Sequence, residues 1–176
     1  MCDRAGSFYE RNGQYAQALR MYCQALDSAL AVWGPGHRNV AASCGNLGMV
    51  YQEQGQYARA LELQHRALEI KIRVCGHDHP DVATSYNNIG IVYKSQGRYN
   101  EALEEYRKCL KIRVDKLGHE HPDVATSHLN IGVVHKQLGD FEKALFHYGK
   151  AQEVFVAVHG HDHLDVAASY NNIGEV

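Results

Sequence analysis

Residues 76–79 read Gly-His-Asp-His, and residues 118–121 read Gly-His-Glu-His. The same Gly-Xaa-Xaa-His pattern occurs at 34–37 and 160–163, so that each copy begins 42 residues after the one before. A fixed period of this length indicates stacked structural units, each burying its hydrophobic face against its neighbours. Such a stack offers long binding surfaces and seldom an enzyme pocket, so the period favours a binding protein over an enzyme.

Each period contains two stretches with the hydrophobic spacing of a helix. Within residues 80–96, apolar side chains recur every three or four positions, which at about 100° per residue places them on one face of a helix. Residues 99–117 have the same spacing, and Gly97 between them allows the left-handed backbone that ends a helix. Because no segment alternates with period two, the sequence predicts an all-α solenoid of antiparallel helix-turn-helix repeats without strands. The two stripes are Val82, Tyr86, Ile89 and Tyr93, then Tyr99, Ala102, Leu103, Tyr106 and Leu110.

We call the two helices of a repeat its first and second helix. A glycine recurs in the middle of each first helix, where glycine costs about 1 kcal/mol relative to alanine. An alanine recurs in each second helix. We therefore expect the two backbones of a hairpin to approach closely, with Gly90 beside Ala102, and a flexible hinge at the glycine is the alternative. The recurring residues are Gly6, Gly48, Gly90, Gly132 and Gly174, and Ala18, Ala60, Ala102 and Ala144.

The composition narrows the class of partner. The chain has 18 Lys and Arg residues against 20 Asp and Glu residues, and it has no run of like charge. The basic surface expected of a protein that binds nucleic acid or an anionic membrane is therefore missing. No apolar stretch reaches the length of about 18 residues that would suggest a membrane span. The five cysteines are odd in number and form no Cys-Xaa-Xaa-Cys pair, which favours reduced thiols and a cytoplasmic protein.

The recurring residues resemble the tetratricopeptide repeat, whose pattern is Asn-Leu-Gly, Tyr, Gly-Xaa-Tyr, Ala, an aromatic residue and Ala-Leu. The usual repeat has about 34 residues, and the longer period of this chain is similar to that of kinesin light chains and nephrocystin-like proteins. The resemblance implies a right-handed superhelix whose first helices line a concave groove for partner peptides. The chain lacks the heptad coiled coil with which a kinesin light chain docks its motor heavy chain. The residues that carry the resemblance are Asn88-Ile89-Gly90, Tyr93, Gly97, Tyr99, Ala102, Tyr106 and Cys109-Leu110.

The recurring positions divide residues 1–176 into one continuous array. We expect full repeats at 37–78, 79–120 and 121–162, and partial repeats at 1–36 and 163–176. Because both ends fall inside a repeat, we expect a fragment of a longer array whose exposed ends favour self-association. A structural or self-assembling array without a peptide groove is therefore the alternative to a peptide-binding module.

The face of each first helix opposite its apolar stripe is the predicted binding groove. With Val82 at 0°, this face lies at roughly 140° to 240°, and it carries an asparagine at the same position of four successive repeats. Each amide hydrogen-bonds either an extended peptide or the neighbouring repeat, and the two uses are compatible. Lys94 and Lys136 favour a partner with acidic residues, whereas Ile91 and Val133 favour an apolar anchor. The candidate groove residues are Asn46, Met49, Glu53, Thr84, Asn87, Asn88, Ile91, Lys94, Asn130, Val133, Lys136 and Asn172.

Three His-Xaa-His loops, at 77–79, 119–121 and 161–163, resemble part of a zinc site. Equivalent loops of stacked helices lie about 8–10 Å apart or more, whereas zinc ligands lie about 2 Å from the ion. One loop alone has too few ligands, so we expect a helix-entry role, no metal and no cofactor. His128 and His135 fall on the core stripe and are expected to pack as aromatic rings, and burial of a charged imidazole leaves a pH-sensitive repeat open. No catalytic motif is present, so we expect no enzymatic activity.

Overall fold

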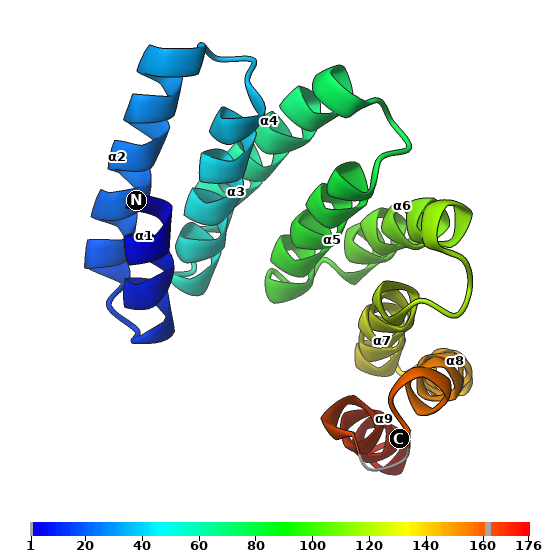
Figure 1. Ribbon diagram of the computed structural model, residues 1–176. Helices are drawn as coiled ribbons and strands as arrows, with labels where there is room; N and C mark the ends of the chain where they lie inside the picture. Colours follow the sequence, from blue (N-terminus) through cyan, green and yellow to red (C-terminus); the bar gives the residue numbers. More distant parts are fainter. Residues whose placement is uncertain (1, 161–162) are drawn as a thin grey trace.

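The computed structural model describes residues 2–160 and 163–176, and all regular secondary structure in these ranges is α-helical. Antiparallel helix pairs stack side by side from the N-terminus to the C-terminus, and the stack curves into an arch (Figure 1). The predicted all-α superhelical solenoid is therefore confirmed. None of the described helices is long and apolar enough to cross a membrane. The helices are α1 (Cys2–Arg11), α2 (Tyr15–Trp33), α3 (Arg38–Glu53), α4 (Tyr57–Cys75), α5 (Pro80–Ser95), α6 (Tyr99–Leu117), α7 (Pro122–Gln137), α8 (Phe141–His159) and α9 (Leu164–Gly174).

The recurring histidines begin the first helices of the repeats. The Nδ1 atom of each histidine accepts the backbone N–H of the residue two positions later, at 3.1 to 3.2 Å. This hydrogen bond satisfies one of the N–H groups that the first turn of a helix leaves unpaired. The predicted helix-entry role is therefore confirmed for the second histidine of each loop, while His161 lies outside the described residues. The capping residues are His37, His79, His121 and His163.

The helix ends also follow the predicted pattern. Pro80 is the first residue of α5, where a missing N–H is tolerated. Gly97, with φ of 73°, separates α5 from α6, and Gly118, with φ of 81°, follows the end of α6. Only glycine adopts these positive φ values without strain. Helix boundaries therefore agree with the expected ranges to within one residue.

The expected close approach of the two helices of a hairpin is present in the repeats on either side of the one that contains Gly90, where a Cβ atom at Gly48 or Gly132 would lie 3.2 or 3.3 Å from the backbone oxygen of Ala60 or Ala144. At Gly90 the nearest atoms belong to a side chain. A Cβ atom at Gly90 would lie 2.6 Å from the ring of Tyr106, which is fully buried. Long helical side chains point back toward the N-terminus of their helix, so the ring of Tyr106 covers the turn that contains Ala102. The ring of Tyr148 covers Gly132 in the same way. The glycine therefore makes room for a ring of the second helix.

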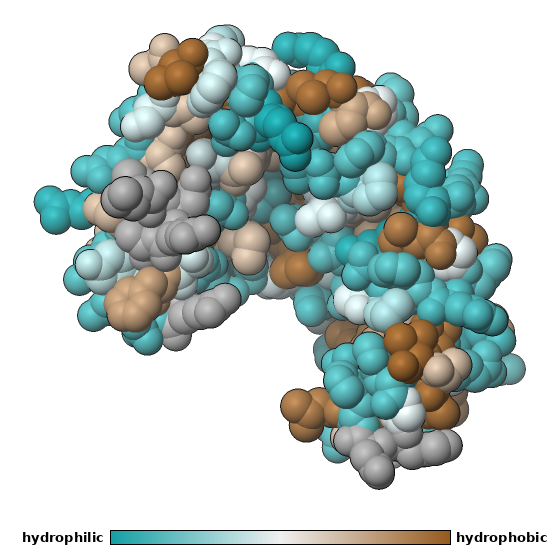
Figure 2. All heavy atoms as spheres, viewed as in Figure 1, coloured by the Kyte–Doolittle hydropathy of each residue, from teal (hydrophilic) through white to brown (hydrophobic). Residues whose placement is uncertain are grey.

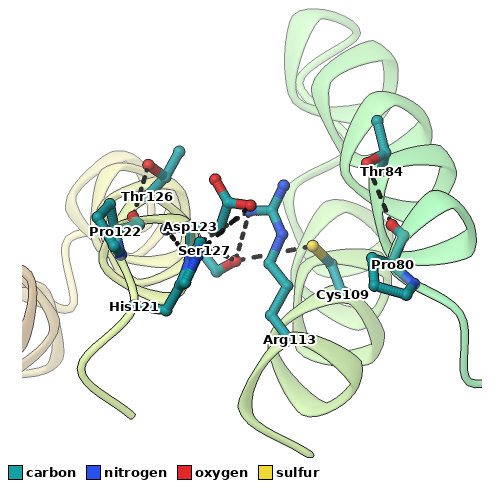
Figure 3. A network of polar contacts seen from close by, with 9 residues as sticks. All are labelled: Pro80, Thr84, Cys109, Arg113, His121, Pro122, Asp123, Thr126 and Ser127. Carbon is teal, nitrogen blue, oxygen red and sulfur yellow. Dashed lines mark hydrogen bonds and ion pairs between the residues drawn. The ribbon is translucent and has the colours of Figure 1, made fainter. Parts of the chain in front are cut away.

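Polar side chains bridge the junction between successive repeats. Figure 3 shows Arg113 of α6 reaching toward the start of α7. Its Nη1 atom donates to the Ser127 hydroxyl and to the Asp123 carbonyl, each at 2.9 Å. One repeat earlier, Lys71 Nζ donates to the buried hydroxyl of Ser85 at 2.9 Å. The first helices α5 and α7 are therefore each fixed both to their own second helix and to the second helix before it.

We expect Gly90→Ala to destabilise the chain, because the new methyl group overlaps the buried ring of Tyr106. Overpacking of this kind costs about 1–3 kcal/mol. Gly149→Ala in α8 is the matched control, because no atom lies within 4 Å of the added methyl group. There we expect a gain of about 0.5–1 kcal/mol from helix propensity. Thermal unfolding measures the change in stability for both substitutions. Equal stabilisation by the two would contradict the close contact between Gly90 and the ring of Tyr106.

Candidate functional site

The predicted groove residues of α5 lie on its solvent-facing side. Thr84 is exposed, while Asn87, Asn88, Ile91 and Lys94 are half-buried. The remaining faces of α5 are buried because the helix packs on both α4 and α6. In Figure 1, α5, α7 and α9 lie on the inner side of the arch, and Figure 2 shows that this side is hollowed. A partner can therefore reach the predicted face.

An open groove of about 630 Å³ lies between α3 and α5. Four of the predicted residues line it, namely Asn46, Met49, Thr84 and Asn88. Met49 and Asn88 also border a smaller adjoining cleft together with Ile91. Glu53 is exposed at the end of α3 and does not line either space. The structure thus brings five predicted residues of two repeats together.

Two cationic side chains that the sequence interpretation missed also line this groove. Arg38 lies at the start of α3 and Lys71 near the end of α4. Burial lowers the pKa of Lys71. Lys71 belongs to a second helix. A helical-wheel projection of the first helices, from which the groove was predicted, could therefore not identify it. Arg38 takes the position that proline holds in α5 and α7. This replacement of proline by a cationic residue is visible in the sequence and could have identified Arg38.

The asparagines divide between two uses. Asn130 Nδ2 donates to Asn87 Oδ1 at 2.8 Å, which links α7 to α5. This pair supports the structural use of the amide. Within the described part of the chain, the side chains of Asn46 and Asn88 have no hydrogen-bond partner, and both line the groove. Their amides are free to bind a ligand.

On the inner side of the arch, an ion pair links α7 to the residue that follows α9. Lys136 Nζ lies 2.8 Å from Glu175 Oε2. The hydrogen bond from Lys136, followed by one from Asn171, lowers the pKa of Glu175. Val133 and Asn172 are half-buried on the same side of the stack, in α7 and α9. An acidic ligand must therefore compete with Glu175 for Lys136.

A cluster of three histidines joins α7 to α8. His128 Nδ1 lies 2.9 Å from His147 Nδ1, and the rings of His135 and His147 stack with centroids 5.7 Å apart. His135 is buried, and its Nδ1 lies 3.3 Å from Asp140 Oδ2. Burial lowers the pKa of His147 to about 4, with smaller effects of His128, His135 and Arg107. His128 and His135 pack as predicted, and His147 completes the cluster.

We expect the cluster to make the chain less stable in mild acid. His147 has a pKa of about 4 when folded and about 6.5 when unfolded. Between these values the unfolded chain binds a proton that the folded chain does not, so the free energy of unfolding falls as the pH drops. Partial exposure of the ring limits the loss between pH 7 and pH 5 to about 1–2 kcal/mol. Urea titrations at the two pH values measure it.

The matched variants are His147→Leu and His65→Gln. Leucine stands at the equivalent position of an earlier repeat, at Leu63, so His147→Leu should fold and flatten the pH dependence. His65 is exposed on α4, and its replacement should leave the pH dependence unchanged. If His147→Leu has the same acid response as the unsubstituted chain, the cluster is not its cause.

Comparisons with known proteins agree with this architecture. The sequence matches the family described as Tetratricopeptide repeat over residues 3–63, 40–113, 95–155 and 123–176. No curated protein matches the chain. Similar solved structures include BtubC (BKLC) from P. vanneervenii, with a TM-score of 0.84 and 21% identity over 97% of this chain and 68% of that chain. A putative kinesin light chain from Podosopora anserina with nearly identical TPR-like repeats has a TM-score of 0.83 and 21% identity over 99% of this chain and 82% of that chain. The apo form of RapI has a TM-score of 0.78 and 21% identity over 97% of this chain and 45% of that chain.

Stacked hairpins with a hollow inner face define a superhelical repeat protein, a fold typical of non-enzymatic interaction scaffolds. The chain belongs to the tetratricopeptide repeat family. It shares its fold with the putative kinesin light chain and with BtubC.

Proposed function

We propose that this chain captures an extended segment of a partner protein in the groove between α3 and α5, and that the segment continues along the inner side of α7. The proposal is carried by the two amides of Asn46 and Asn88, which face the open groove without a partner among the described residues. Each amide has two donors and one acceptor, the groups that a peptide backbone complements. Met49 and Ile91 provide apolar surface beside them. The site therefore suits a peptide with polar backbone contacts and one apolar anchor.

The charges around the groove favour acidic residues in that peptide. Arg38 and Lys71 line it against the single carboxylate of Asp81, and Lys94 lies half-buried further along α5. The chain as a whole has a formal charge of −2, so the attraction is local and unlike that of a nucleic-acid or membrane binder. We further propose a cytoplasmic setting, which the unpaired Cys23, Cys44, Cys75 and Cys109 support.

The test uses peptides selected from a random display library against the native chain. We expect Asn46→Ala combined with Asn88→Ala to weaken every groove-bound peptide by about 5- to 100-fold, the equivalent of two hydrogen bonds. Thermal stability should not fall, because alanine is the better helix former. Isothermal titration and thermal unfolding measure the two quantities.

Two controls separate binding from folding. Asn130→Ala removes the bond to Asn87, so we expect it to lower the melting temperature. Glu104→Ala, on the exposed side of α6, should change neither quantity. Peptides that bind the double Asn variant with unchanged affinity would exclude the proposed groove.

The ion pair at Lys136 provides a test of the charge preference. Glu175→Gln removes the competing carboxylate, so we expect tighter binding of acidic peptides and no change for uncharged ones. Lys94→Met should weaken acidic peptides, and both effects should shrink as salt screens the charges. Titrations at low and high ionic strength measure them. Equal effects on acidic and uncharged peptides would contradict the preference.

Self-assembly into a longer array is the second candidate function. It draws on apolar side chains exposed on α8, namely Phe141, Leu145 and Phe146. Exposed apolar surface of this kind favours association between chains. Sedimentation equilibrium without peptide distinguishes the two functions, because self-assembly raises the apparent mass with concentration and the groove substitutions leave it unchanged.

A further inference from the structure

One buried hydrogen-bond acceptor beside the groove has no partner. Gln64 of α4 is 1% exposed, and it lines the small cleft that adjoins the groove. Its Nε2 atom donates to the Gly45 carbonyl at 3.0 Å, whereas its Oε1 atom has no hydrogen-bond partner in the described part of the chain. An unpaired buried acceptor is unfavourable. The amide of Gln64 therefore has an unused acceptor next to the proposed binding site.

The sequence departs from the repeat pattern at both of these positions. Glycine stands at position 45 where later repeats have Asn87 and Leu129. A Cβ atom at Gly45 would lie 4.0 Å from Gln64 Oε1, so a larger side chain there would stand beside this oxygen. Hairpin packing accounts for an aromatic ring at the position of Gln64 but not for an amide. Three other repeats have tyrosine at that position, namely Tyr22, Tyr106 and Tyr148.

The size and lining of the cleft indicate which side chain fits it. Its volume is about 40 Å³, and one water molecule needs about 10–15 Å³ of such a volume. The cleft therefore has room for roughly three non-hydrogen atoms. A threonine side chain has three, and it combines one hydroxyl donor with one methyl group. The cleft is lined by the apolar side chains of Met49, Ile91 and Val92 and by the amides of Gln52, Gln64 and Asn88.

We propose that this cleft is a subsite for one threonine side chain of the captured peptide, whose hydroxyl donates to Gln64 Oε1 and whose methyl group packs against Met49 and Ile91. The inference rests on the proposed peptide-binding function of the groove. Met49 is 42% exposed, and its flexible side chain turns aside to admit the threonine. Valine has the same shape but leaves the acceptor of Gln64 unpaired, so Gln64 selects threonine over valine.

The test compares two display pools of peptides that differ only at a fixed central residue, which is threonine in one pool and valine in the other. The flanking positions are random and exclude serine and threonine. Both pools compete for the immobilised native chain, and sequencing gives the ratio of retained peptides. We expect the threonine pool to be retained about 3- to 10-fold better, the equivalent of one neutral hydrogen bond.

Three variants assign this preference to the unpaired acceptor. Gln64→Met keeps nearly the same length and removes the acceptor, so we expect the ratio to fall to about one. Gln64→Tyr installs the residue of the other repeats, which should keep the chain folded, fill the cleft and abolish the preference as well. Gln52→Met is the matched control, because it removes another amide of the same cleft and should keep the preference. Thermal unfolding verifies that each variant is folded.

The outcomes distinguish the subsite from the groove. Suppose that the native chain retains both pools equally, and that Asn46→Ala combined with Asn88→Ala weakens both. The threonine subsite is then overturned and the groove stands. A threonine preference that persists in Gln64→Met also overturns the subsite. If the native chain retains neither pool, the groove is overturned together with the subsite.

Discussion

The fit of a second-helix side chain over a first-helix glycine fixes the spacing of each hairpin, and the remaining structure depends on that spacing. Over Gly90 and Gly132 the side chain is tyrosine, and the hydroxyl groups of Tyr106 and Tyr148 are buried without a hydrogen-bond partner in the described part of the chain. An unpaired buried hydroxyl costs about 1–3 kcal/mol. Burial of the ring must outweigh this cost. At the equivalent position Gln64 instead donates to a backbone carbonyl of α3 at 3.0 Å.

Successive hairpins pack on one another through the same positions of each repeat. Its first helix is covered by its own second helix and by the second helix before it, where Ser85 and Ser127 accept hydrogen bonds from Lys71 and Arg113. One face of the first helix remains open, and repetition places these faces side by side on the inner side of the arch (Figure 1). A groove formed in this way is present before binding, so a peptide does not have to order the protein.

Periodicity predicted the parts of the structure that depend on side-chain direction within one helix. It gave the helix ranges, the buried stripe and the solvent-facing side of α5, since these follow from 3.6 residues per turn. Contacts between helices depend on side-chain length and rotamer, and there the sequence interpretation was incomplete. It did not predict that the ring of Tyr106 covers Gly90, and it missed Lys71 because that residue comes from a second helix. The bond between Asn130 and Asn87 likewise requires the offset between repeats.

The central claim is that an extended peptide lies along the first helices. Amide chemical-shift mapping with ¹⁵N-labelled protein and a selected peptide tests it most directly, because each residue reports its own surroundings. The groove predicts the largest shift changes at inner residues of α3 and α5, such as Asn46, Asn88 and Lys94, with small changes on the outer faces of α4 and α6. Changes concentrated on the outer faces, with the inner residues unperturbed, would contradict the claim.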